Sequence, residues 1–295
     1  MKLKKRQADT IKFYAFISPW IIGFLCFSVI PMIFSFYFSF TKYNILDPPK
    51  WVGLDNYIRL FTDEPDFLRA LQNTGIFMVF RVFLGLIIPL LVALLFNSGI
   101  KGRNIMRTFV YLPAIIPAVG SALIWQFMFS ADFGLFNYVL GSLGFQQIEW
   151  LSVENAMASI IFMSVWSGIG PTMIILLAGL QGVPQTLYEA ADIDGITPFK
   201  KLIKITIPLI SPTLFYVFIT GMIGSIQMFT ESKLLTGGGP AGATETLSMM
   251  VFANAYNKMG YASAMAWVIF VITLVFTVFF FRYMRGLVYY EGGED

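Results

Sequence analysis

Few side chains in this sequence are suited to covalent or metal chemistry. The chain contains no histidine and a single cysteine, Cys26, which lies inside an apolar run. Transition metals are usually held by several His, Cys or carboxylate ligands, so a metal site is not expected. No arrangement of nucleophile and base is visible either, and we expect no catalytic residues.

The side chains that stand out are polar and aromatic groups placed within apolar segments. Ser225, Gln227 and Phe229 belong to the segment IGSIQMFTESK, with Glu231 near its outer end, and Trp166 lies in an earlier apolar run. Polar groups are costly inside a membrane and tend to face cavities, so these five residues are candidates for lining a pathway. The alternative is that they make ordinary contacts between helices.

A glycine-rich stretch, TGGGPAG at residues 236–242, invites comparison with a phosphate-binding loop. It lacks the Lys-Ser/Thr pair that ends a P-loop, and no such pattern occurs elsewhere in the chain. We interpret it as a tight turn. The sequence therefore predicts no productive ATP binding by this chain.

The composition identifies the elements that must position these groups. Hydrophobic residues make up 57% of the chain and charged residues 13%, against about 25% charged in a typical soluble domain. A bilayer core of ~30 Å requires about 20 apolar residues in a helix. Runs of that length, uncharged except for Arg81, lie at residues 13–40, 75–97, 109–130, 156–180, 209–230 and 262–281.

Long uncharged runs indicate helices, because a spanning backbone must satisfy its own hydrogen bonds and barrel strands would be short and alternating. The prediction is an all-α polytopic membrane protein with six transmembrane helices. Residues 1–12 form an N-terminal tail and residues 13–295 the transmembrane domain. The first run is too long for a signal peptide and is expected to be retained. Kinks are predicted at Pro19, Pro31, Pro89, Pro113, Pro117, Pro171 and Pro212.

Basic residues predict the orientation of the chain. They concentrate in the N-terminal tail, in the loop after the second run, in residues 181–208 and, as Arg282 and Arg285, after the sixth run. The positive-inside rule makes these segments, and both termini, cytoplasmic. The net charge of +3 therefore reflects orientation, and no nucleic-acid partner is expected.

Residues 181–208 are much longer than a simple connection needs, and they contain PQTLYEAADIDGITPFKKLIKITIP. Pro184 and Gly195 mark the start and stop of one short helix, and Thr197-Pro198 begins a second. Leu187, Tyr188 and Ala191 share a face that suits docking to a partner. A helix that simply lies on the membrane is the alternative.

The spacing of Glu189-Ala190-Ala191, Gly195 and Ile205-Thr206-Ile207-Pro208 resembles the EAA signature of binding-protein-dependent ABC importer permeases, with Ile207 where leucine is usual. WVGLDNYIRLF (51–61), LQNT (71–74), TGGGPAGATETL (236–247) and GYASAMAW (260–267) resemble the maltose and multiple-sugar branch of that family. The resemblance implies a type I importer fold. It also implies that Tyr188, Glu189, Ala190, Ala191 and Gly195 form a helix that couples the chain to an ATPase.

The resemblance further implies the partners: a second homologous permease, two ATP-binding subunits that hold ATP and magnesium, and an extracytoplasmic sugar-binding protein. It places the chain in a bacterial cell membrane and the Ser225–Glu231 segment beside the sugar. By the chemistry of their side chains, Gln227 would bind sugar hydroxyls, and Phe229 or Trp166 would stack on the apolar face of the ring. Permeases for glycerol phosphate, ion-driven transporters and membrane scaffolds remain alternatives. The lack of basic residues in the apolar cores of spans three to six, and of carboxylates within the spans, weighs against the first two.

Overall fold

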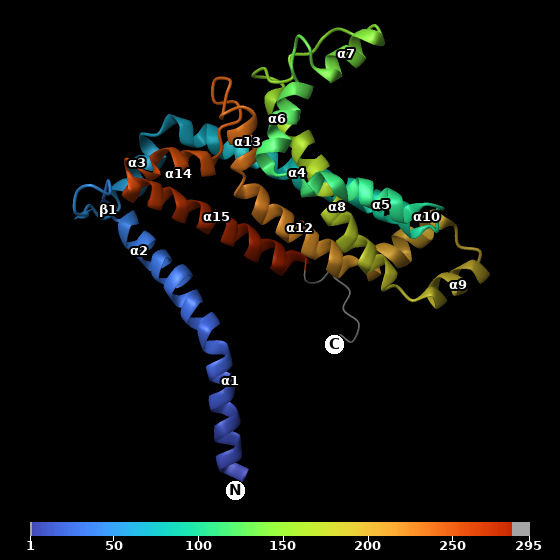
Figure 1. Ribbon diagram of the computed structural model, residues 1–295, viewed down its shortest axis with the longest axis horizontal. Helices are drawn as coiled ribbons and strands as arrows, with labels where there is room; N and C mark the ends of the chain where they lie inside the picture. The colour runs from blue at the N-terminus through green and yellow to red at the C-terminus, as the bar shows by residue number, and fades with distance from the viewer. Residues whose placement is uncertain (1, 285–295) are drawn as a thin grey trace. The chain divides into compact units, whose positions relative to one another are not determined.

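The computed structural model describes residues 2–284 of the chain (Figure 1). Arg285, which was predicted to be cytoplasmic, lies outside the described residues. The chain divides into two compact units, residues 1–64 with 251–268 and residues 65–250 with 269–295, and each is considered by itself.

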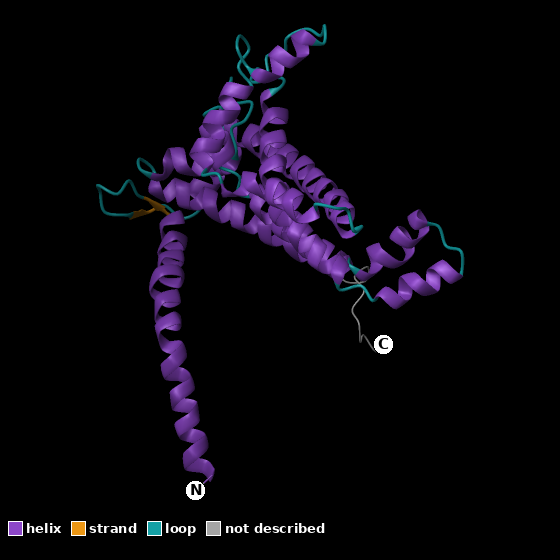
Figure 2. Ribbon diagram, turned by 45° about the vertical axis from the view of Figure 1, so that its right-hand side comes forward, coloured by secondary structure: helices purple, strands orange, loops and turns teal. Residues whose placement is uncertain are grey.

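The described residues are almost entirely helical, and strand is confined among them to one two-stranded hairpin (Figure 2). The elements are α1 (Lys2–Phe24), the π-helical turn η1 (Leu25–Val29), α2 (Ile30–Ser39), β1 (Thr41–Lys42), β2 (Lys50–Trp51), α3 (Asp55–Thr62), α4 (Pro65–Asn97), α5 (Arg103–Tyr111), the 3₁₀ turn η2 (Leu112–Ile115), α6 (Ala118–Met128), α7 (Leu135–Ser142), α8 (Ala156–Gln181), α9 (Gln185–Ile193), α10 (Pro198–Lys201), the π-helical turn η3 (Leu202–Thr206), α11 (Ile207–Leu209), α12 (Ser211–Ile226), α13 (Thr230–Leu235), α14 (Leu247–Ala255) and α15 (Met259–Met284). The predicted all-α class is confirmed.

Six membrane spans are present when each strongly bent pair of helices is taken as one. Four are continuous, at Asp9–Ser39, Pro65–Asn97, Ala156–Gln181 and Met259–Met284. The other two are bent, by 98° between Ile115 and Ala118 and by 69° between Leu209 and Ser211. The predicted number of spans is confirmed, although the fifth helix ends at Ile226 and not at residue 230.

The proline positions separate gentle curvature from sharp bends. Pro19, Pro89 and Pro171 lie inside long helices that continue through them. The two sharp bends each contain a pair of prolines four residues apart, Pro113 with Pro117 and Pro208 with Pro212. One proline removes one backbone hydrogen bond, whereas two in successive turns leave too few to hold the axis straight.

The first unit contains the N-terminal span and the hairpin. The span is long and apolar, but none of its most apolar stretch is buried within the chain. Thr41 pairs with Trp51 across the hairpin, and Asn56 of α3 donates to the carbonyl oxygens of Ser39 and Thr41, both at 2.9 Å. WVGLDNYIRLF is thus divided between β2 and α3, which begins at Asp55.

The second unit is organised around α4 and α8, which lie side by side (Figures 1 and 2), with α12 against α4. Its core has one apolar cluster around Trp125 and Ile160 and another around Met173 and Leu176. At Gly170 of α8 an added Cβ would lie 2.6 Å from the Tyr111 Cα atom and 2.7 Å from the Val110 oxygen. Glycine is therefore needed where α8 meets the α5–η2 corner.

Candidate coupling loop and substrate cavity

The coupling loop, residues 181–208, has the two helices that the sequence predicts. Pro184 precedes α9 as its N-cap, one position earlier than expected, and Gly195 follows it with φ of +69°. The Ile196 N–H donates to the Ala191 oxygen at 2.9 Å, and the Gly195 N–H to the Asp192 oxygen at 3.1 Å. This pair of bonds is a Schellman motif, which ends a helix at a left-handed residue and explains the glycine.

The face of α9 that was predicted to dock is only partly accessible, because Leu187 is exposed whereas Tyr188 is half-buried. Ala191 is buried, and the Tyr188 hydroxyl lies 2.9 Å from the Thr206 hydroxyl across the loop. Glu189, Ala190 and Gly195 are exposed. The inward pair holds the two halves of the loop together, which leaves Ala190 as the small residue on the accessible side.

Two apolar side chains that sequence reasoning missed are accessible in this loop. Ile193 is 88% exposed and Phe199 is 70% exposed. Ile193 lies between two aspartates and Phe199 precedes two lysines, so their apolar character did not stand out from the composition of the insert. Their exposure in a loop with a buried face of its own indicates a surface suited to contact with another protein.

Two of the five predicted pathway residues share a cavity. Ser225 and Glu231 line a cavity of about 250 Å³ together with Arg81, Ser164 and Thr220; its remaining lining residues are Phe77, Gly221, Gly224 and Met228. Ser225 is buried and donates to the Gly221 oxygen in its own helix, at 2.7 Å. The sequence singled out Ser225 and Glu231, whereas Arg81 stood out only as the one charge in its apolar run. The hydrogen bond from Arg81 to Ser164 shows that this side chain lies inward.

Gln227 and Phe229 occupy the break between α12 and α13. Gln227 ends α12 and is exposed, and Phe229 precedes α13 as its N-cap. Neither lines the cavity of Ser225 and Glu231. The prediction assumed one unbroken helix to residue 230, and the break at Gln227 rotates these side chains away from the helical positions that it assumed.

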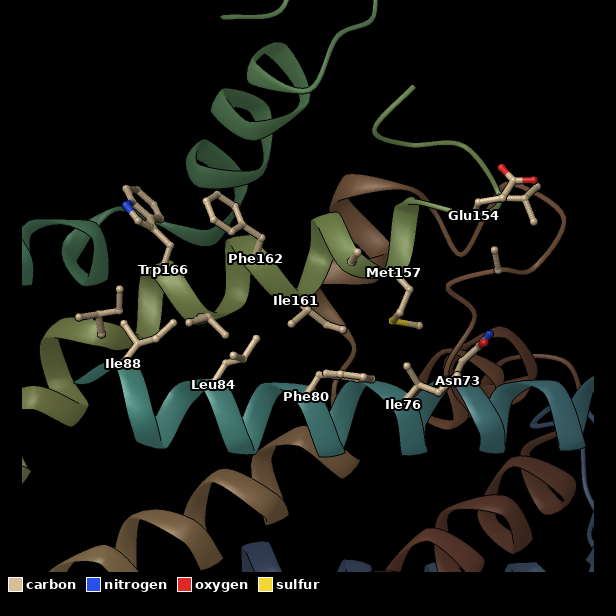
Figure 3. A pocket seen from close by; sticks show the side chains of 15 residues that line it. Asn73, Ile76, Phe80, Leu84, Ile88, Glu154, Met157, Ile161, Phe162 and Trp166 are labelled. Atoms are coloured by element: carbon tan, nitrogen blue, oxygen red, sulfur yellow. The ribbon is translucent and has the colours of Figure 1, made fainter. Parts of the chain in front are cut away.

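Trp166 lines a different, largely apolar cavity of about 880 Å³ between α4 and α8. Figure 3 shows this cavity with Leu84 and Ile88 directed from α4 toward α8, and with Trp166 of α8 directed away from α4. The Trp166 ring meets the buried Trp125 ring edge to face, with centroids 5.2 Å apart. The structure therefore places Trp166 in an aromatic cluster and does not bring it to the cavity of Ser225.

The glycine-rich loop, residues 236–246, is held by buried hydroxyls and by α4. The Thr244 hydroxyl donates to the Gly239 oxygen at 3.0 Å, and Thr246 donates to the Met228 oxygen at 2.8 Å. Asn73 of α4 donates to the oxygens of Gly242 and Glu245, both at 2.9 Å. The turn predicted from TGGGPAG thus fixes the segment that carries Glu231. Asn73, which belongs to the LQNT stretch, anchors the loop to α4.

Residues 85–288 match the model of the family described as binding-protein-dependent transport system inner membrane component. The chain belongs to this family. The match covers more than half of the chain and includes the α8, α9 and α12 segments that form the coupling loop and one wall of the cavity. The family predicted from the EAA spacing is confirmed, and the chain is a multi-pass membrane protein of that family.

Relatives of known name match the chain over nearly its whole length. A probable ABC transporter permease, YesP of Bacillus subtilis, is 38% identical over 100% of this chain and 97% of its own. The trehalose/maltose transport system permease MalF of Thermococcus litoralis is 36% identical over 96% of each. A bacterial alginate ABC transporter, solved in complex with alginate pentasaccharide-bound periplasmic protein, contains a chain with a TM-score of 0.84 and 27% identity, covering 97% of this chain and 98% of that one. The predicted carbohydrate branch is confirmed by these likenesses.

Proposed function

We propose that this chain is the permease subunit of an ATP-driven, binding-protein-dependent importer of sugars or oligosaccharides, in which it forms half of the translocation pathway. The observation that carries the proposal is the full-length similarity to a trehalose/maltose permease. A polar cavity among the spans, with hydroxyl and charged groups facing it, supports the same function.

The other half of the pathway is assigned to a second, homologous permease. The N-terminal span supports this assignment, because none of its most apolar stretch is buried. Helices in membranes associate by close packing, so such a surface is available to another subunit as well as to lipid. An extracytoplasmic sugar-binding protein would deliver the substrate from the outer side.

Energy would come from two ATP-binding subunits, which hold ATP and magnesium, since this chain has no phosphate-binding motif. The coupling loop is the proposed contact, with both termini and this loop in the cytoplasm of a bacterial cell. In this scheme ATP-driven closure of the ATPase pair moves α9. The movement passes to α8 through the short connection from Gln181 to Gln185. Hydrolysis then resets the pathway inward, and this chain itself performs no covalent chemistry.

Affinity purification of the tagged chain from its native membrane in mild detergent tests the proposal. A second permease of six spans and a P-loop ATPase are expected to co-purify, and a saccharide delivered by the binding protein is expected to raise ATPase activity. Recovery of the chain alone as a homo-oligomer would contradict the proposal and would favour an ion-driven transporter.

The exposed Ala190 provides a sharper test of the coupling loop. Ala190→Trp is expected to leave the complex in the membrane but to abolish stimulation of the ATPase, because a large ring would hold the docking surface apart. Ala190→Ser is the matched control and should behave as the unmodified protein. Full stimulation of the purified Ala190→Trp complex would show that α9 does not dock through this face.

A further inference from the structure

Arg81 is a permanent charge in the apolar part of the membrane helix α4. Residues 75–97 of α4 contain no other charged side chain. Placing an arginine at membrane depth costs about 3 kcal/mol or more, so arginines in spans usually serve a cavity or a partner. The Arg81 Nε–H donates to the Ser164 hydroxyl of α8 at 2.9 Å, and the side chain lines the cavity of about 250 Å³.

Two glycines form a slot for the Arg81 guanidinium. A Cβ added at Gly85 of α4 would lie 2.0 Å from Nη1, and a Cβ added at Gly168 of α8 would lie 2.3 Å from Nη2. Both glycines are helical and have no positive φ, so their backbone conformation does not require glycine. An added Cβ at either position would push the end of the Arg81 side chain aside. Two helices thus lack side chains where this one cation lies.

The guanidinium keeps most of its hydrogen-bonding capacity. It has five N–H donors, and within residues 2–284 the bond to Ser164 is the one that it makes. Glu231 lines the same cavity and acts on Arg81 electrostatically, but the two form no ion pair within the described part of the chain. A positive group with free donors therefore faces the cavity, and a carboxylate stands farther off.

We propose that Arg81 binds an anionic substituent, above all a carboxylate, of the transported saccharide, so that the importer favours acidic sugars. This inference rests on the proposed function. Ser and Gln side chains suffice to bind neutral hydroxyls, whereas a guanidinium offers a planar fork that matches a carboxylate with two parallel bonds. The bound carboxylate touches Arg81 and stands farther from Glu231, so attraction exceeds repulsion. Glu231 accepts hydrogen bonds from sugar hydroxyls.

Equilibrium binding to the complete importer in nanodiscs, measured by saturation-transfer NMR without the binding protein, tests this inference. The probes are a panel of uronate disaccharides, each paired with its own neutral methyl ester. We expect an acid to bind about ten-fold or more tightly than its ester, since charge-assisted bonds are the stronger kind. Arg81→Gln should remove that difference and leave the ester unaffected, and Glu231→Gln should tighten binding of the acid.

Glycine variants separate the position of the guanidinium from its charge. Gly168→Ala keeps Arg81 but displaces Nη2, so it should reduce the preference for acids. Gly75→Ala of α4, where an added Cβ meets nothing within 4 Å, is the matched control. Both should leave the amount of assembled complex unchanged.

Two results would overturn the inference. One is equal binding of every acid and its ester by the unmodified importer. The other is loss of both ligands in Arg81→Gln with recovery in the Arg81→Gln/Glu231→Gln double variant, which would identify an internal charge pair. If neutral saccharides still raise ATPase activity in either case, only the Arg81 inference fails. If no saccharide does, the proposed function fails with it.

Discussion

The two irregular segments on either side of α12 are built in opposite ways. In the coupling loop, Ile193 and Phe199 are largely exposed apolar groups, and the loop is closed by a turn, one pair of hydroxyls and the Asp192–Lys201 ion pair. Around the glycine-rich loop, Ser232, Thr244 and Thr246 are polar and fully buried. The glycine-rich loop completes its own hydrogen bonds, whereas the coupling loop leaves apolar surface for a partner. Damage to the former should therefore reduce stability, and damage to the latter should reduce communication.

The largest effect is expected from Asn73→Asp, which disrupts the hydrogen bonds between α4 and the glycine-rich loop. Asp has the same shape, but it turns a carboxylate oxygen toward the two carbonyl oxygens that the Asn73 amide now serves. The loss is about 3 kcal/mol or more, because a buried charge is left without donors. A strongly lowered Tm of the purified complex is the expected reading. Gln72→Glu, which adds the same charge at an exposed neighbour, should change little. An equal Tm for both variants would show that Asn73 does not anchor the glycine-rich loop to α4.

Thr244→Val tests the same loop at its centre, with an expected loss of about 1–3 kcal/mol. Valine keeps the volume but leaves the Gly239 oxygen and the Thr236 hydroxyl without their buried partner. The comparison is with Thr62→Val, which removes an exposed hydroxyl bonded to its own helical turn. Thermal denaturation should separate the two variants. Similar Tm values for the two variants would mean that the buried hydroxyl of Thr244 stabilises the protein no more than an exposed one.

Gly195→Val moves the test to the coupling loop. A residue with a branched Cβ pays about 1–2 kcal/mol at a left-handed φ, and here the cost is conformational alone because an added Cβ would meet no atom within 4 Å. We expect faster hydrogen exchange in α9 and weaker co-purification of the ATPase, with Tm nearly unchanged. Gly195→Asn, which tolerates this conformation, should retain both properties. A large fall in Tm would show that the coupling loop, like the glycine-rich loop, contributes to the stability of the fold.

Asp192→Asn should have the smallest effect. It removes the ion pair between Asp192 and Lys201, in which the Asp192 side chain is 70% exposed and the Lys201 side chain 14% exposed. Because the carboxylate is largely in water, the pair contributes about 0.5 kcal/mol. Neither Tm nor stimulated ATPase activity should change measurably at high salt. A pronounced loss of coupling would show that this pair, and not the Schellman turn, fixes the loop.

The spans and the coupling loop could be predicted because their signals are local. An uncharged run of about 20 residues indicates a helix wherever it lies in the fold. Pro184, Gly195 and Thr197 mark helix ends through the conformations that their own backbones favour. The sharp bend at Pro113 and Pro117 coincides with a pair of prolines, whereas the helix around the isolated Pro89 continues. The difference between paired and isolated prolines becomes visible only when the two helices are compared in the structure.

The cavity could not be predicted because its parts are distant in sequence and face one another only after packing. Arg81 depends on Ser164 and Gly168, and Asn73 reaches a loop 169 residues away. In a membrane helix every face is apolar, so the pattern does not show which side faces inward. Trp166 illustrates this: its type suits a sugar, but its direction places it beside Trp125.

The unburied first span also bears on how the protein is made. Residues 9–39 are synthesised before the other five spans, and folding of the chain buries none of their most apolar stretch. Insertion therefore yields a helix that is stable in lipid, and the contacts described for it within the chain gather near its end, where Phe36 packs against Trp267. In the proposed complex, the second permease would cover that helix, so its exposure would mark a newly made subunit that is not yet assembled. An excess of this chain over its companion should accordingly be short-lived, with degradation by membrane proteases setting the ratio of the two.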